Sequence, residues 1–186
     1  MKYLARFPHE FKTWLAGWKY KGELPAEKKA VIISVPHTSN WDFFWGELAF
    51  LSQGIPAFIL MKKEFFFFPL GMILRALNVI PVDRGNKDSQ LVEQMITEFK
   101  QRDSMYLCIT PEGSRKKRKK WKKGFLVIAK AAGVPVYLGR IDYKGKYCEV
   151  GPLFYPTEDV DADLAYIMST YHDANPKYPE NFSNGN

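Results

Sequence analysis

The sequence is poor in cysteine and has no long uninterrupted apolar run. Its two cysteines among 186 residues, Cys108 and Cys148, each lie in a predicted strand and show no metal-binding or redox spacing. We therefore expect reduced core thiols, as in a cytoplasmic protein, rather than a disulfide framework. No apolar run is long enough to span a bilayer. Proline and polar residues within positions 8–12 interrupt the N-terminal apolar residues, so no signal peptide is expected.

Strands and helices are predicted to alternate along most of the chain. The predicted strands are residues 30–35, 57–61, 79–83, 105–110, 134–142 and 147–151, and the predicted helices are 40–52, 66–77, 89–102, 123–132 and 159–173. This alternation and the length predict one α/β domain, with a largely parallel or mixed sheet flanked by helices. We assign residues 1–24 to an N-terminal amphipathic segment, 25–174 to the domain, and 175–186 to a polar tail that we expect to be poorly ordered.

A histidine and an aspartate flank the predicted start of a helix. His37 follows the apolar run 31–35, and Asp42 falls in the first turn of the helix predicted over 40–52. Ser39 or Asn40 is suited to cap that helix. A carboxylate near the imidazole would fix its tautomer and stabilise the imidazolium, so the pair predicts a general base.

A second polar turn follows another predicted strand. Residues 105–110 lead directly into Glu112 and Arg115. Because parallel strands end at a common edge of a sheet, we expect this carboxylate and guanidinium to face the His37 turn.

Together these segments resemble the glycerophospholipid acyltransferases of the lysophosphatidic acid type. The resemblance covers residues 31–139 and consists of His37 and Asp42, an arginine at the end of the strand Val79–Arg84, and the run Pro111–Arg115, in which Ser114 stands where threonine is usual. Intermediate stretches at 62–71 and 121–124 also match. The order and spacing of these motifs are more specific than any one of them.

The resemblance implies a reaction and a set of roles. His37 would deprotonate an acceptor hydroxyl, which attacks the thioester of acyl-CoA or acyl carrier protein. The residues implied to bind the acceptor, a lysophospholipid or a glycerol phosphate, are Arg84, Glu112, Gly113, Ser114, Arg115 and Lys62. Backbone N–H groups near Asn40 or Gly113 are candidates for an oxyanion site. No metal and no cofactor other than the acyl donor are expected.

The net positive charge of the chain comes from one segment. Eight of the nine residues 115–123 are lysine or arginine, and subtracting them from the net charge of +7 leaves −1 for the rest. Such a run is often only a solvated surface, and with Trp121 inside it would also suit nucleic acid. Its position between two motifs favours phosphorylated substrates and anionic lipid headgroups. The residues assigned to this surface are Lys116, Lys117, Arg118, Lys119, Lys120, Lys122 and Lys123.

Two aromatic stretches are candidates for a membrane contact. Phe11, Trp14, Leu15 and Trp18 recur at helical spacing, which fits an interfacial helix or a stripe packed on the domain. Residues 65–74 are apolar on more than one helical face, and we expect most of them to be buried. We expect a peripheral enzyme on the inner face of the cell membrane.

The alternatives are a nucleic-acid-binding protein, or a thioester hydrolase that uses water as acceptor. A serine hydrolase is not expected, because no Gly-x-Ser-x-Gly elbow occurs.

Overall fold

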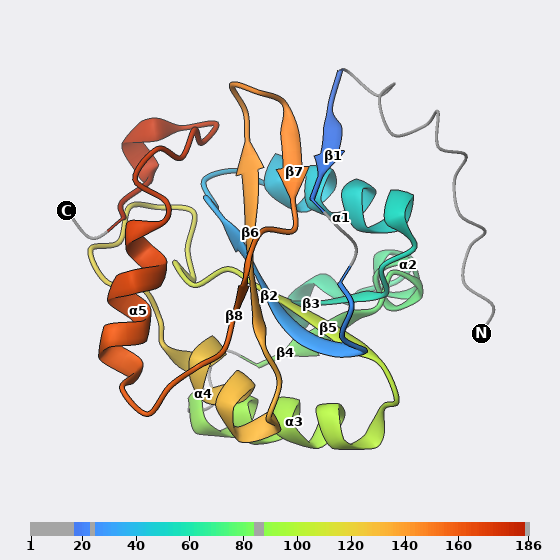
Figure 1. Cartoon of the computed structure of the whole chain (residues 1–186). Helices are drawn as coiled ribbons and strands as arrows, with labels where there is room; N and C mark the ends of the chain where they lie inside the picture. Colours follow the sequence, from blue (N-terminus) through green and yellow to red (C-terminus); the bar gives the residue numbers. More distant parts are fainter. Residues whose placement is uncertain (1–16, 23–24, 84–87, 185–186) are drawn as a thin grey trace.

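An eight-stranded, mostly parallel sheet lies at the centre of the described part of the molecule (Figure 1). The computed structural model describes residues 17–22, 25–83 and 88–184. The strands are β1 (Lys19–Lys21), β2 (Lys29–Val35), β3 (Ala57–Lys62), β4 (Val79–Val82), β5 (Met105–Ile109), β6 (Val136–Asp142), β7 (Tyr147–Glu149) and β8 (Leu153–Phe154). The helices are α1 (Trp41–Gln53), α2 (Leu70–Ala76), α3 (Asp88–Gln101), α4 (Gly124–Ala132) and α5 (Val160–Ser169), with short 3-10 turns η2 (Lys63–Phe65) and η3 (Pro179–Asn181). The predicted α/β class is confirmed.

The strand order brings the turns of interest to one edge. The order is β1-β7-β6-β2-β5-β3-β4, and β8 pairs with β6. Strands β2 to β6 run parallel to their neighbours among themselves, whereas β7 and β8 run antiparallel to β6. The segments that follow β2, β5 and β3 therefore leave the same edge of the sheet, side by side.

Strand β2 supplies side chains to the core on both faces of the sheet. Val31, Ile33 and Val35 belong to a cluster that includes side chains of α3, α4 and α5. Ala30 and Ile32 belong to a second cluster, which includes a side chain of α1. Because alternate residues of a strand point to opposite faces, helices α3 to α5 cover one face and α1 covers the other. A strand buried on both faces reads as a continuous apolar run, and that pattern predicts β2.

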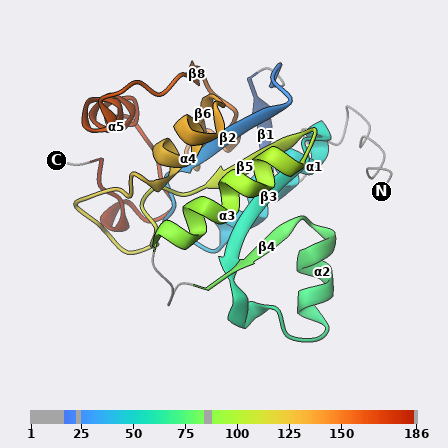
Figure 2. The same cartoon turned by 90° about the horizontal axis from the view of Figure 1, so that it is seen from below.

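The expectation that residues 66–77 form one mostly buried helix is wrong. Helix α2 is confined to Leu70–Ala76, and Phe65, Phe67 and Phe68 precede it with exposed side chains. The β3–α2–β4 unit lies at the β4 edge of the sheet, where few elements are available to cover it (Figure 2). A high share of apolar residues in a segment predicts that it is buried. At the edge of the sheet, however, too few neighbouring elements pack against residues 65–74 to bury them.

The expectation of a poorly ordered tail is also wrong for residues 175–184. The indole Nε1 of Trp121 donates to the carbonyl oxygen of Ser183 at 2.9 Å. Phe182 packs against the larger core cluster, with its ring 6.5 Å from that of Trp121. The packing of Phe182 and the bond to Ser183 attach the end of this segment to the domain.

Residues 1–16 lie outside the described part of the chain, and with them lies most of the predicted amphipathic stripe. Its last member, Trp18, is described and stacks on Trp45 of α1 at a centroid distance of 4.6 Å.

Cys108 and Cys148 are buried and unpaired, as expected. Within the described ranges, no helix combines the length and the apolar character needed to cross a membrane.

Candidate active site

The turn between β2 and α1 brings His37 and Asp42 together. Imidazole Nδ1 lies 3.2 Å from Asp42 Oδ2. The histidine side chain is 21% exposed and the aspartate side chain only 2%. Asp42 therefore contacts the imidazole from inside the protein, while the imidazole remains accessible to a substrate.

Three further donors hold the Asp42 carboxylate in place. The backbone N–H groups of Thr38 and Ser39 both donate to Oδ2 at 2.7 Å. The hydroxyl of Tyr143 donates to Oδ1 at 2.6 Å. A buried carboxylate with several donors is satisfied and fixed in orientation. A carboxylate held in this way beside the ring can support an imidazolium.

Of the two side chains predicted to cap α1, Ser39 binds a first-turn N–H and Asn40 does not. Asn40 occupies the N-cap position, but its side chain makes no capping bond. Ser39 Oγ accepts from Trp41 N at 3.1 Å, and Asp42 binds the N–H groups that precede the helix. The aspartate thus orders the turn as well as orienting the histidine.

The geometry of the pair determines which nitrogen can accept a proton. Because Nδ1 of His37 faces the Asp42 carboxylate, Nδ1 carries the hydrogen in the neutral ring, and Nε2 holds the free lone pair. A group that approaches Nε2 can therefore lose a proton to it. This is the arrangement of a general base with its orienting carboxylate.

Tyr143 is a site residue that sequence reasoning missed. It follows β6, lies 101 residues from Asp42 in the chain, and contacts Trp18 edge to face at 5.0 Å. Burial and the neighbouring Asp42 carboxylate raise the pKa of Tyr143 above its ordinary value, so its hydroxyl remains a donor. No local motif marks this residue, because its role depends on where β6 ends relative to α1.

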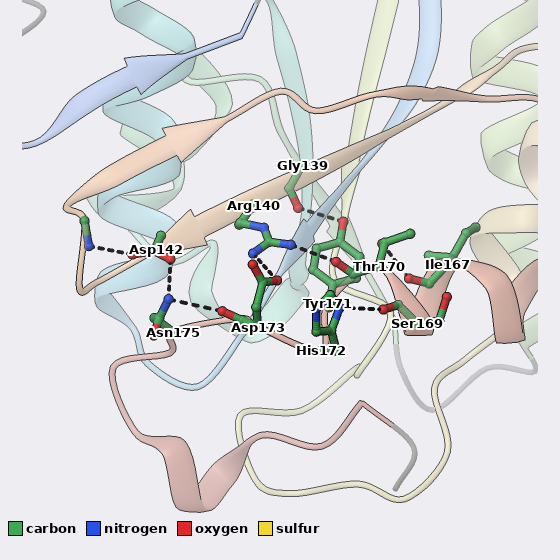
Figure 3. Close-up of polar contacts among 11 residues, drawn as sticks. Gly139, Arg140, Asp142, Ile167, Ser169, Thr170, Tyr171, His172, Asp173 and Asn175 are labelled. Carbon is green, nitrogen blue, oxygen red and sulfur yellow. Dashed lines mark hydrogen bonds and ion pairs between the residues drawn. The ribbon is translucent and has the colours of Figure 1, made fainter.

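A polar network joins the end of β6 to the segment after α5 (Figure 3). The backbone N–H of Tyr143 donates to the carbonyl of Asn175 at 2.9 Å, and the amide of Asn175 donates to Asp142 at 2.7 Å. Arg140 donates to Asp173 at 2.7 Å. The segment after α5 is therefore attached to the end of β6 at several points, and it supports the position of Tyr143.

The same C-terminal segment also reaches the turn that carries His37. The backbone N–H of Tyr178 lies 3.3 Å from Thr38 Oγ1, to which it donates. The ammonium of Lys177 lies 5.1 Å from the ring centroid of Trp41, within range of a cation–π contact. Residues that the sequence assigned to a tail thus border the site.

Glu112 connects the turn after β5 to the turn after β2. Its Oε1 accepts from the backbone N–H of His37 at 2.8 Å. The carboxyl group is buried, and burial raises its pKa to about 8. Its Oε2 has no hydrogen-bond partner among the described residues. The contact made by Glu112 is therefore to the backbone that carries the histidine.

The residues that follow Glu112 differ in exposure. Gly113 has φ of +62°, a conformation that favours glycine, and its N–H donates to the carbonyl of Thr110 at 3.0 Å. That N–H is thus engaged and unsuited to an oxyanion site. Ser114 Oγ accepts from the N–H of Lys116 at 3.1 Å, and Arg115 is exposed.

The two other predicted acceptor ligands, Lys62 and Arg84, come at or after the ends of strands β3 and β4 in the sequence. Lys62 is exposed at the end of β3, which is the strand next to β5. Arg84 lies outside the described residues, two positions beyond the end of β4.

The basic segment is exposed except for its tryptophan. Residues 116–120 are all exposed, whereas Trp121 is buried and contacts Tyr171. The backbone N–H of Lys122 donates to the carbonyl of Pro111 at 2.8 Å, and Lys123 forms an ion pair with Asp161. The segment is therefore a loop whose two ends are fixed beside the Glu112 turn.

A partly exposed histidine beside a buried aspartate, at the edge where parallel strands of an α/β domain end, is an arrangement that can serve as a general base. Residues 18–138 match the family model described as Acyltransferase. Because this match spans more than half of the chain, the chain belongs to the acyltransferase family. Neither a curated protein nor a solved structure matches it.

Proposed function

We propose that this protein transfers a fatty acyl group from acyl-CoA or acyl carrier protein to the hydroxyl of a lysophospholipid or glycerol-phosphate acceptor. The observation that carries the proposal is the ordered contact between His37 and Asp42, in which the aspartate is buried and the histidine remains accessible. Membership of the acyltransferase family supports the type of reaction. The acyl donor and the lipid acceptor rest on the motif resemblance.

The proposed reaction needs no covalent acyl-enzyme. Nε2 of His37 takes the proton of the acceptor hydroxyl while the hydroxyl oxygen attacks the thioester carbonyl. The tetrahedral intermediate then expels the thiolate, which receives the proton from the imidazolium. Asp42 stabilises that imidazolium, and Tyr143 holds Asp42. The new ester bond replaces the broken thioester bond, so atoms and charge balance.

The proposed acceptor site lies beside this pair. Arg115 is exposed next to the Glu112 turn, and with Arg84 it would hold the acceptor phosphate, since a guanidinium can donate two parallel hydrogen bonds to phosphate. Lys62 is a further candidate for the same group. The bond from His37 N–H to Glu112 supports a positioning role for Glu112 through the histidine backbone.

The alternatives explain fewer of these features. A nucleic-acid-binding loop would use an exposed aromatic side chain for stacking, but Trp121 is buried. A thioester hydrolase would need no arginine to bind an acceptor phosphate. We propose instead that the basic loop attracts the enzyme to the anionic inner face of the cell membrane, where the acceptor is found.

A single assay tests the proposal. The purified protein is incubated with radiolabelled palmitoyl-CoA, or with acyl carrier protein bearing the same group, and with a panel of lysophospholipids and glycerol 3-phosphate. The expected result is a labelled acylated lipid that the His37→Ala variant does not form. Labelled free fatty acid without lipid product would instead identify a hydrolase. Arg115→Ala should raise the KM for a phosphorylated acceptor and leave that for the donor unchanged.

A further inference from the structure

Five apolar side chains form an exposed surface after β3, which we call the phenylalanine patch. The exposed fractions are 47% for Phe65, 59% for Phe67, 83% for Phe68, 63% for Met72 and 56% for Ile73. All five fall within nine consecutive residues. Isolated exposed apolar side chains are ordinary, but five of them within nine residues are the composition of an interaction surface.

The local backbone holds these side chains outward. The N–H of Gly71 donates to the carbonyl of Phe67 at 2.7 Å, and the N–H of Met72 donates to that of Pro69 at 3.0 Å. A Cβ at Gly71 would lie 2.7 Å from the carbonyl oxygen of Phe66, so only glycine allows this close approach. Leu74 is buried and attaches α2 to the domain. The exposed side chains therefore lie on an ordered turn, and these hydrogen bonds define its conformation.

The patch lies at the same edge of the sheet as the proposed site. It begins where β3 ends, and β3 pairs with β5, which leads into the Glu112 turn. Strand β5 in turn pairs with β2, which leads into the His37 turn. Figure 2 shows α2 at the margin of the molecule, beyond β4, with no other labelled element outside it. A flat surface could contact the patch and lie next to the site.

The charges around the patch favour an anionic partner. Residues 65–82 contain one charged side chain, that of Arg75, whose guanidinium lies 5.4 Å from the ring centroid of Phe66. Lys62 precedes the patch, and the exposed basic residues 116–120 leave the neighbouring strand at the same edge. The nearest carboxylates in sequence are Glu64 and Asp83, and Asp83 forms an ion pair with Lys63.

We infer that the phenylalanine patch inserts into the interfacial region of an anionic lipid bilayer and holds the His37 site at the membrane surface. This inference rests on the proposed function, since a lysolipid acceptor must reach the base from the bilayer. Aromatic and aliphatic side chains flanked by cations are the composition of an interfacial anchor. The patch offers no side-chain hydrogen-bonding group among its five members, so it suits an unstructured apolar medium better than a protein partner that must bind in one orientation.

Vesicle binding by matched variants of the full chain tests the inference. Phe67→Ser with Phe68→Ser removes two apolar side chains from the patch, and Leu153→Ser with Tyr155→Ser removes two exposed ones elsewhere. On vesicles of phosphatidylcholine with phosphatidylglycerol, the patch variant should bind roughly 10- to 100-fold more weakly than wild type. The control should bind within about twofold of wild type. Equal binding by both variants would overturn the inference.

Insertion is measured directly with a fluorophore. Because Cys108 and Cys148 are buried, an environment-sensitive dye can be attached selectively in a Phe68→Cys variant, with Tyr155→Cys as control. Brominated lipids should quench the dye at position 68 and leave the dye at position 155 unaffected. A dye at 68 that is already shielded without lipid would mean that another part of the chain, a second copy or a partner protein covers the patch, and would overturn the inference.

The two proposals fail in different ways. Vesicle binding is measured without acyl substrates, so a protein that inserts through the patch and transfers no acyl group would contradict only the proposed function. Conversely, acyl transfer to vesicle-borne lysolipid that is unaffected in the patch variant would contradict the inference alone. Transfer to a short-chain, water-soluble acceptor should be equal in wild type and patch variant.

Discussion

At the scale of single residues, the histidine turn uses one carboxylate for two purposes. Asp42 binds the N–H groups of Thr38 and Ser39 and also faces His37. Replacement of this residue therefore affects turn geometry as well as charge. The two effects can be separated by comparing a variant of the histidine with an isosteric variant of the aspartate.

His37→Ala and Asp42→Asn should both fold and lose acyl transfer by a factor of about 10² to 10⁴, the usual contribution of a general base. The thermal midpoint of each variant, measured alongside kcat, shows whether a lost rate reflects the chemistry or a disordered turn. His172→Ala, at an exposed position after α5, is the matched control and should retain wild-type rates. Full activity in a folded His37→Ala protein would assign the base elsewhere.

Tyr143→Phe removes the hydroxyl that donates to Asp42 and leaves the ring in contact with Trp18. A buried acceptor that loses one donor costs about 1 to 3 kcal/mol, so the variant should be less stable by that amount in urea unfolding. Turnover should also fall, because Asp42 is less well held. Tyr155→Phe removes an exposed hydroxyl and should change neither quantity. Wild-type turnover in Tyr143→Phe would limit this residue to a structural role.

The motif resemblance implies that Glu112 contacts the acceptor, and its bond to the His37 N–H supports a positioning role through the histidine backbone. Glu112→Gln keeps an oxygen that can accept from the His37 N–H, whereas Glu112→Ala removes it. We expect the alanine variant to lose about 1 to 3 kcal/mol of stability and most of its turnover, and the glutamine variant to lose much less of both. Comparable kcat values for the two variants would show that the bond between Glu112 and the His37 N–H does not determine turnover.

At the scale of elements, the sequence patterns that predict the fold correctly are those with a clear physical cause. Strand β2 and helix α3 are predictable because an apolar run and a helical stripe report burial directly. The pairing of the two polar turns follows from parallel topology. Predictions fail where burial depends on distant neighbours. Among the described residues no element covers the phenylalanine patch, whereas Phe182 packs into the core around Trp121. Tyr143 could not be predicted, because its partner is 101 residues away.

Helix α1 carries a second buried acid, which has no role in the proposed reaction. Glu47 is buried, its Oε2 has no partner among the described residues, and burial raises its pKa from 4.5 to about 7. The folded protein thus binds this proton more tightly than the unfolded chain. Stability from this group is fully present below pH 4.5 and is lost as the pH rises through about 7.

Glu47→Gln should remove that pH dependence. Between about pH 5 and pH 8 the wild type should lose about 2 to 3 kcal/mol through this group, and the variant should not, so its thermal midpoint at the upper end of that range should be higher by several degrees. Glu158→Gln, at an exposed position, serves as control and should follow the wild-type curve. Parallel curves for wild type and Glu47→Gln would mean that this carboxyl does not titrate in that range.

At the scale of the whole molecule, charge and apolar surface are gathered at one edge of the sheet. The basic loop leaves β5 at that edge and the phenylalanine patch leaves β3 beside it. The two features act over different distances, since attraction between charges is screened by salt and apolar insertion is not. Association with a membrane should therefore have one salt-sensitive part and one salt-resistant part.

Replacement of the five basic residues 116–120 by serine tests the salt-sensitive part and leaves Arg115, Lys122 and Lys123 in place. Each cation near an anionic surface contributes about 1 kcal/mol, so the variant should bind acidic vesicles much more weakly at low salt. The difference from wild type should shrink as salt is added, while transfer to a water-soluble acceptor should be unchanged. Serine replacement of Lys144 and Lys146, exposed lysines in the β6–β7 loop, is the control for loss of charge alone. If the wild type instead bound oligonucleotides tightly at physiological salt, ignored acidic vesicles and transferred no acyl group, the loop would be a nucleic-acid surface, because phosphate contacts would then account for its charge.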